Sequence, residues 1–196
     1  MQKPFSQACV NNSAPIFSVL EHLLADKHQV LEVGSGTGQH AVYFSERLPH
    51  LQWQTSDLTI NHAGINAWLE DYSGNNVHPP IELNVASNDW EIHADAVFSA
   101  NTAHIMSWPV AQQMLIGVGK TLSTGGVFVL YGPFNYNGEF TSASNAQFDV
   151  WLKQQKPHQG IRHIEEVIVT AESAGLVLDS DHEMPANNRL LVFKKT

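Results

Sequence analysis

The sequence predicts an α/β protein, a three-layer αβα fold with a seven-stranded and mostly parallel sheet. Three observations lead to it. Apolar stretches of strand length alternate with stretches of helical periodicity along the chain. A glycine-rich turn joins the first expected strand to a helix at 30–40. The last two expected strands are joined so tightly that they must be antiparallel. The 196 residues, 43% of them hydrophobic, favour one domain over 1–196.

Each element follows from a local pattern. Residues 1–13 are polar and are expected to be irregular, and Pro15 suits the first turn of a helix that ends near Asp26. The strands are expected at about 29–33, 51–57, 81–85, 95–100, 127–131, 176–183 and 189–195, and the later helices at 39–48, 60–72, 108–122, 145–155 and 164–174. The least regular stretch, about 133–160, is expected to form a lid or a substrate-selecting wall.

The run from Val30 to His40 predicts a nucleotide-binding corner. A strand, a tight glycine turn and a helix N-terminus direct backbone N–H groups and the helix dipole toward a polar ligand. Dinucleotide sites use G-x-G-x-x-G, whereas these glycines fall at 34, 36 and 38. A Walker loop is excluded because no Gly-Lys-Ser/Thr follows. This spacing, with Glu32 two positions before the first glycine, resembles motif I of class I S-adenosylmethionine-dependent methyltransferases.

Two polar residues at later strand ends extend this hypothesis. Asp57 lies about 20 residues beyond the glycines, where such folds place a carboxylate that accepts from both ribose hydroxyls. The alternative for Asp57 is a helix cap or a turn. The amide of Asn84, after the third strand, can meet the adenine edge, or it can cap a loop. Residues 99–104 follow the fourth strand beside the switch point and should face the reacting centre.

Composition excludes several classes of partner. The formal net charge is −9 and the ten Lys and Arg are scattered, so no footprint for nucleic acid exists. A small neutral or cationic substrate suits this charge better. One cysteine, Cys9, allows no intrachain disulfide, and no apolar run suggests a signal peptide or a membrane span, so we expect a cytoplasmic protein. The eleven histidines show no metal-ligand spacing, so we expect no metal.

Motifs along nearly the whole chain resemble the family called domain of unknown function 938. They are Val30–His40, S-D-L at 56–58, F-S-A-N-T-A-H-I-M-S-W at 98–108, Y-G-P-F-N-Y at 131–136, Phe148, Asp149, Trp151 and Leu152, G-I-R at 160–162 and M-P-A-N-N at 184–188. The run at 98–108 is far more specific than the glycine loop. The family pattern has Asp where this chain has Asn84, and tends to have Asp where it has His163.

The resemblance implies a Rossmann-like class I methyltransferase fold and an S-adenosylmethionine-dependent methyltransferase, with S-adenosylhomocysteine as product. We expect in-line methyl transfer to a small-molecule acceptor, which the resemblance does not name. The expected cofactor-binding residues are Glu32, Gly34, Ser35, Gly36, Gly38, Asp57, Leu58, Asn84, Val85 and Asn101.

The candidates for catalysis are Asn101, which would line the methyl-transfer face, His104 and Tyr136. An imidazole titrates near neutral pH, so His104 is the best candidate for a base, and its alternative is packing at a helix entry. Tyr136 and Glu139 in the expected lid are weaker candidates for substrate contact. Arg162 could bind a substrate anion or pin the lid by an ion pair. The five tryptophans are expected in the core, although Trp108 and Trp151 could contact substrate.

Two other functions compete with methyl transfer. A non-catalytic module that binds S-adenosylmethionine, S-adenosylhomocysteine or a protein partner is the first, because the sequence defines no certain base. A nicotinamide-dependent oxidoreductase is the second, and Gln39 in place of a late glycine, with the closing antiparallel strands, argues against it.

Overall fold

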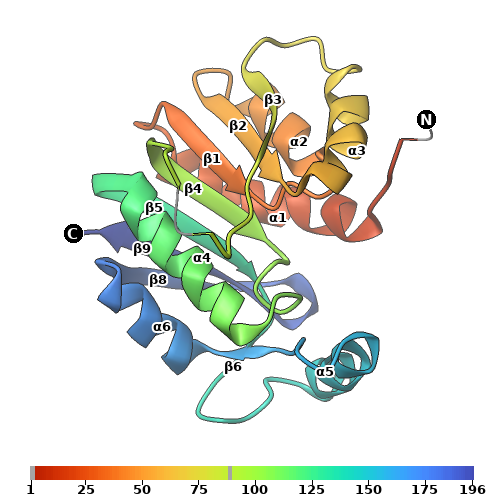
Figure 1. Cartoon of the computed structure of the whole chain (residues 1–196), viewed down its shortest axis with the longest axis vertical. Helices are drawn as coiled ribbons and strands as arrows, with labels where there is room; N and C mark the ends of the chain where they lie inside the picture. The colour runs from red at the N-terminus through yellow and green to blue at the C-terminus, as the bar shows by residue number, and fades with distance from the viewer. Residues whose placement is uncertain (1–2, 88–89) are drawn as a thin grey trace. The chain divides into compact units, whose positions relative to one another are not determined.

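The computed structural model describes residues 3–87 and 90–196. The chain divides into two compact units, Met1–Asn84 with Ala94–Ser99, and Val85–His93 with Ala100–Thr196. Each unit is described separately below. The main strands follow the order β3-β2-β1-β4-β5-β9-β8 in a seven-stranded sheet (Figure 1). This is the α/β fold with a mixed seven-stranded sheet that the sequence predicts. The expectation of a single domain stays a prediction.

The first unit has four parallel strands and three helices. The strands are β1 (Gln29–Val33), β2 (Gln52–Asp57), β3 (Val77–Glu82) and β4 (Ala94–Ala100). β1 pairs with both β2 and β4, and β2 pairs with β3, always in parallel. The helices are α1 (Gln7–Leu23), α2 (Gln39–Arg47) and α3 (Thr59–Leu69), and α2 packs against both of the others (Figure 1). Phe44, Trp53 and Phe98 meet ring to ring in the core.

The second unit closes the fold with antiparallel strands. Its elements are α4 (Trp108–Thr121), β5 (Leu122–Gly132), β6 (Phe134–Asn135), α5 (Ala143–Gln155), β7 (Arg162–His163), α6 (Ile164–Ser173), β8 (Leu176–Met184), the 3-10 helix η1 (Pro185–Asn187) and β9 (Asn188–Lys195). β9 pairs antiparallel with β5 and with β8, as predicted for the last two strands. Helix α4 packs against α6. β5 is buried from Val127 to Gly132, which explains its continuous apolar run.

The start of the first helix was predicted wrongly. Helix α1 begins at Gln7, so residues 7–13 are helical, and Pro15 lies inside the helix instead of at its first turn. The side chain of Ser6 caps the helix by accepting a hydrogen bond from the Cys9 N–H at 3.3 Å. A proline costs an internal helical hydrogen bond, but burial of Ile16 and Leu20 on the apolar face holds the helix together across it.

The third strand was also placed too late. β3 begins at Val77 and contains Pro79 and Pro80, whereas the sequence suggested 81–85. β3 is at one end of the strand order, so the N–H groups that the prolines lack are needed least there. Its pairing with β2 shifts register between Gln54 and Ser56, around the prolines. Asn84 therefore follows the strand by two residues.

A small parallel pair, β6 with β7, was not predicted. Two residues per strand are too few to give a periodic signal. After β6, Tyr136 and Glu139 exchange two backbone hydrogen bonds across a turn whose central residues, Asn137 and Gly138, both have positive φ. Asn-Gly is the sequence that such a turn favours. The expected lid at 133–160 thus begins with a paired strand and a hydrogen-bonded turn.

Every helix within 3–87 and 90–196 falls short of the length and apolar character that crossing a membrane would require.

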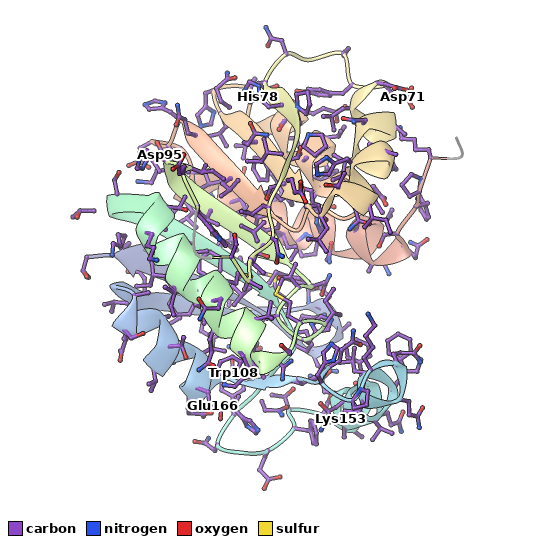
Figure 2. All side chains as sticks on the ribbon, viewed as in Figure 1. Asp71, His78, Asp95, Trp108, Lys153 and Glu166 are labelled. Atoms are coloured by element: carbon purple, nitrogen blue, oxygen red, sulfur yellow. The ribbon has the colours of Figure 1, made fainter. Side chains whose placement is uncertain are left out.

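Asp95 anchors the start of β1 and gives a test of the first unit. Its two carboxylate oxygens accept from the N–H groups of His28 and Gln29, both at 2.8 Å (Asp95 is labelled in Figure 2). We expect Asp95→Ala to lower the free energy of unfolding by about 1–3 kcal/mol, measured by urea denaturation, because two N–H groups lose a charged acceptor. Asp26→Ala is the control, since that carboxylate is 79% exposed. Equal effects of the two variants would contradict the anchoring role.

Candidate functional site

The glycine corner follows β1 and has the left-handed backbone that its sequence predicts. Gly34, Gly36 and Gly38 have φ of 74°, 58° and 88°, values that glycine adopts without steric cost. The N–H groups of Gly34 and Ser35 both donate to the carbonyl oxygen of Ser56, at 3.0 and 2.9 Å. The turn after β1 is therefore fixed to the end of β2.

Two of the three glycines face different surroundings. A Cβ on Gly38 would lie 3.2 Å from the backbone of Ile65 and 3.3 Å from Cβ of Trp68, so Gly38 allows α2 and α3 to approach closely. A Cβ on Gly36 would meet no described atom within 4 Å. The backbone at Gly36 thus borders open space, as a ligand-binding turn requires.

Glu32 is buried below this turn. Its carboxylate accepts from the hydroxyl of Ser35 at 2.9 Å and from the indole N–H of Trp53 at 3.1 Å. Burial raises the pKa of Glu32 to about 7, against the lowering effect of these two hydrogen bonds. Trp53 is fully buried, in agreement with the expected core position, and its indole N–H helps to hold the Glu32 carboxylate.

The raised pKa of Glu32 predicts a pH-dependent stability. An unfolded glutamate has a pKa of 4.5, so above that pH the folded state holds a proton that the unfolded chain has released. The folded state therefore loses about 3 kcal/mol as the pH rises from the lower pKa to the higher one. Glu32→Gln removes this loss. We expect the stability of wild type relative to Glu32→Gln to fall between about pH 5 and about pH 7.5 in urea denaturation.

The exposed Glu172 on α6 supplies the control for this measurement, as Glu172→Gln. A difference between wild type and Glu32→Gln that stays constant with pH would show that Glu32 does not titrate in this range.

Asp57, at the end of β2, faces the glycine turn. One carboxylate oxygen accepts from the Gly36 N–H at 2.8 Å, and the other accepts from the N–H of Leu58 and the amide of Asn61, each at 2.7 Å. A carboxylate can accept about four hydrogen bonds, so capacity for another donor remains. Asp57 is not the cap of α3, since Leu58 is the N-cap residue, and its local hydrogen bonds leave room for a ligand. The Asp57 carbonyl also accepts from Leu83 N–H at 3.0 Å, which fixes the chain just before the exposed Asn84.

In the second unit, Asn101 and His104 lie in the loop that leads to α4. Asn101 has a left-handed φ of 59°, and its N–H donates to the carbonyl of Tyr131 at 2.9 Å. His104 is buried, its ring packs edge-on against Phe148, and its carbonyl accepts from Gly160 N–H at 2.9 Å. Val85, a further candidate in this unit, is buried. The loop is therefore held to the end of β5 and to the segment before β7.

The environment of His104 changes its expected chemistry. Burial, with a smaller contribution from the Arg162 charge, lowers the pKa of His104 to about 4. The ring is thus neutral at neutral pH and does not titrate there, unlike the ordinary imidazole assumed from the sequence. A neutral imidazole can still accept a hydrogen bond, but as a base it is weak.

This environment predicts a titration by NMR. In uniformly ¹⁵N-labelled protein we expect the His104 imidazole to stay neutral at about pH 6, where an ordinary exposed histidine is mostly protonated. The variant His104→Gln identifies its signals. If the His104 signals titrate near the ordinary value, the ring is accessible to water and remains available as a neutral-pH base.

Arg162 holds this loop by hydrogen bonds. Its guanidinium donates to the carbonyl oxygens of Ala103 at 3.0 Å, Met106, and His158 at 3.1 Å. The ion pair suggested from the sequence is absent among the described residues, because backbone carbonyls occupy the guanidinium instead. Trp108 lies with its ring centroid 5.9 Å from the guanidinium carbon. Arg162 is therefore a structural clamp.

Tyr136 lines a cavity of about 410 Å³ in the second unit. Its hydroxyl donates to Asp181 at 2.7 Å. Burial and this carboxylate raise the pKa of Tyr136 well above its ordinary value, so the hydroxyl stays protonated. The other residues that line the cavity are Thr141, Glu183, Met184, Asn187, Asn188 and Arg189.

Comparison with known proteins gives the family. Residues 3–195 match the family described as "Protein of unknown function (DUF938)". The chain belongs to this family.

The solved structures similar to this DUF938 protein include several methyltransferases. An O-methyltransferase family protein from Burkholderia thailandensis superposes with a TM-score of 0.84 at 18% identity, over 94% of this chain and 56% of that one. PigF, solved with SAH, gives 0.78 at 17%, over 97% and 64%. Human N-acetylserotonin methyltransferase, solved with SAM, gives 0.80 at 14%, over 96% and 53%. The DUF938 chain spans between half and two thirds of these neighbours' lengths, and at such identities the likeness establishes the fold alone.

Several polar residues of this DUF938 protein were missed at the level of sequence. Asn135 is only 4% exposed, and its side-chain oxygen has no hydrogen-bond partner among the described residues. Asp181 and Arg189 form an ion pair at 2.8 Å beside the cavity. The register of the final hairpin places Glu183 opposite Arg189, a pairing of opposite charges that the short connection at 185–188 could have indicated. Asn135 falls within the Y-G-P-F-N-Y run at 131–136, but no local pattern sets it apart from its neighbours there.

In the described part of the chain, no three His, Cys, Asp or Glu side chains gather into a group that could hold a metal ion.

Proposed function

We propose that this protein is an S-adenosylmethionine-dependent methyltransferase that acts on a small molecule. The observation that carries the proposal is the glycine corner, where Gly36 borders open space and Asp57 turns its carboxylate toward the same turn. It lies at the carboxyl ends of β1 and β2, where folds of this kind bind ligands. The methyltransferase fold of the structural neighbours supports the same reading, as do SAH and SAM in two of them.

Residues of the first unit fit the cofactor. The turn at Gly34, Ser35 and Gly36 would hold the methionine part, with Gly38 keeping the helix close behind it. Glu32 would orient the amino group through the turn, because its carboxylate is already held by Ser35 and Trp53. Asp57 and Leu58 would hold the ribose, and Asn84, with Val85 after it, would meet the adenine. The sulfonium of the bound cofactor supplies an activated methyl group.

Catalysis then needs mainly placement and exclusion of water. Asn101 keeps its proposed place at the methyl-transfer face, and its left-handed backbone is held by Tyr131. The neutral His104 would accept a hydrogen bond from the acceptor molecule. It would take a proton only from an acceptor atom that has become acidic because its lone pair now binds the methyl group. The protonated Tyr136 would bind the acceptor instead of acting as a base.

The test is calorimetric titration with S-adenosylhomocysteine. We expect micromolar binding to wild type, weakened by about 1–3 kcal/mol in Asp57→Ala, because a charged acceptor of hydrogen bonds is lost. Asp57→Asn should lose less, since one acceptor oxygen remains. Asp71→Ala is the matched control, as Asp71 is exposed and pairs only with Lys3 among the described residues.

The variants must first be shown to be folded by circular dichroism. No heat from folded wild type, or equal affinities for wild type and Asp57→Ala, would overturn the proposed cofactor site. Binding of S-adenosylhomocysteine without any labelled product, when labelled S-adenosylmethionine is supplied to several cell extracts, would favour the non-catalytic module over the enzyme.

A further inference from the structure

The cavity beside Tyr136 lies at the edge of the second unit where a ligand is expected. Gly132, the last residue of β5, is directly opposite Arg189 of β9 in the hydrogen-bonded register. One residue earlier, the carbonyl of Tyr131 accepts from Asn101. Arg189 lines the cavity, so the cavity opens at the carboxyl end of β5. A volume of about 410 Å³ is within the range of small-molecule sites.

The wall of the cavity is built in advance of any ligand. Ala186 and Asn187, between β8 and β9, both have a left-handed φ of 57°, a conformation that costs energy in residues with a side chain. Asn145 of α5 donates to the carbonyl of Asn187 at 3.0 Å, and the Asn187 amide donates to Ser144 at 3.1 Å. The helix thus holds the turn in this strained form, which fixes where the side chains of the turn are presented.

The charges around the cavity are unequal. Asp181 binds the Arg189 guanidinium at 2.8 Å and also accepts from Tyr136, so it neutralises the arginine. Glu183 lies 3.2 Å from the other side of the same guanidinium, and its side chain is 90% exposed. Two carboxylates therefore share one guanidinium, which leaves one negative charge at the rim. A ligand that carries an anion would face this surplus carboxylate.

The neutral groups of the wall also favour a ligand that donates hydrogen bonds. The amide nitrogens of Asn187 and Asn188 donate to Ser144 and to the Pro185 carbonyl, which directs their amide oxygens away from these partners. Amide oxygens accept hydrogen bonds, so these two residues suit a ligand that carries N–H or O–H groups.

We propose that this cavity is the acceptor subsite of the enzyme and that it recognises a small molecule by a protonated amine, with Glu183 as the counter-ion. The inference rests on the proposed methyltransferase function and names the substrate class for it. The three N–H donors of an ammonium group match the carboxylate and the amide oxygens of the wall. The amine is the group that is recognised, and the atom that receives the methyl group is a separate matter.

Three probes that share one skeleton test the charge preference: 3-phenylpropylamine, 3-phenylpropionate and 3-phenylpropan-1-ol. Each is titrated into ¹⁵N-labelled protein while amide shifts are followed. We expect the amine to bind about fivefold or more tighter than the carboxylate, with the alcohol between them, and to shift amides within 183–189. Glu183→Gln should weaken amine binding about three- to fivefold, as expected for loss of an exposed ion pair.

Two further variants sharpen the result. Glu172→Gln makes the same charge change on the exposed face of α6, away from the cavity, and should leave amine binding unchanged. Asn188→Asp adds a carboxylate to the wall and should tighten amine binding while it weakens that of the carboxylate probe. Circular dichroism confirms that each variant is folded.

The proposal is overturned if the carboxylate binds as tightly as the amine, if the amine does not bind, if its shifts fall outside the cavity, or if Glu183→Gln and Glu172→Gln act equally. Titration with S-adenosylhomocysteine in the same samples separates the two proposals. Cofactor binding without amine preference overturns only the subsite, whereas amine binding without cofactor binding overturns the methyltransferase.

Discussion

The carbonyl and amide of Ser56 are the constraint on which the first unit depends. The carbonyl accepts from two successive N–H groups of the glycine corner, and the Ser56 N–H donates to the hydroxyl of Ser35. That hydroxyl in turn donates to the buried Glu32. The turn after one strand is thereby tied to the end of its neighbour, so the open space at Gly36 and the carboxylate of Asp57 keep a fixed relation. A ligand would find them in position without reordering the backbone.

The second unit uses clamps of another kind. Arg162 donates to three backbone carbonyls, and Asp149 of α5 accepts from the Ile161 N–H at 2.8 Å. Both fix the chain around 158–162, next to the loop that carries His104. At the cavity, by contrast, the carboxylates of Asp181 and Glu183 share the single guanidinium of Arg189.

The sequence predicted the fold well because its signals were local. The seven expected strands, and their alternation with helices, follow from short apolar runs. The glycines from Gly34 to Gly38 mark a turn that few other sequences would form. The starts of α1 and β3 were predicted wrongly because both elements contain prolines, Pro15 in α1 and Pro79 and Pro80 in β3. Tertiary packing outweighed the local preference of proline there. Residues whose function depends on distant partners were out of reach: nothing local shows that Arg162 would find three carbonyls, or that burial would lower the pKa of His104. The roles of the site residues stay predictions for the same reason.

The chain's other left-handed positions bear on the glycine corner. Asn101, Asn137 and Asn187 all adopt positive φ, so this fold accommodates asparagine where the backbone alone requires that conformation. Gly36 has the same φ and room for a side chain, and yet it is glycine. At Gly38 the neighbours Ile65 and Trp68 demand a bare backbone, whereas no described atom makes that demand at Gly36. The side chain of an asparagine would therefore find room at position 36, whereas at position 38 it would force α2 and α3 apart.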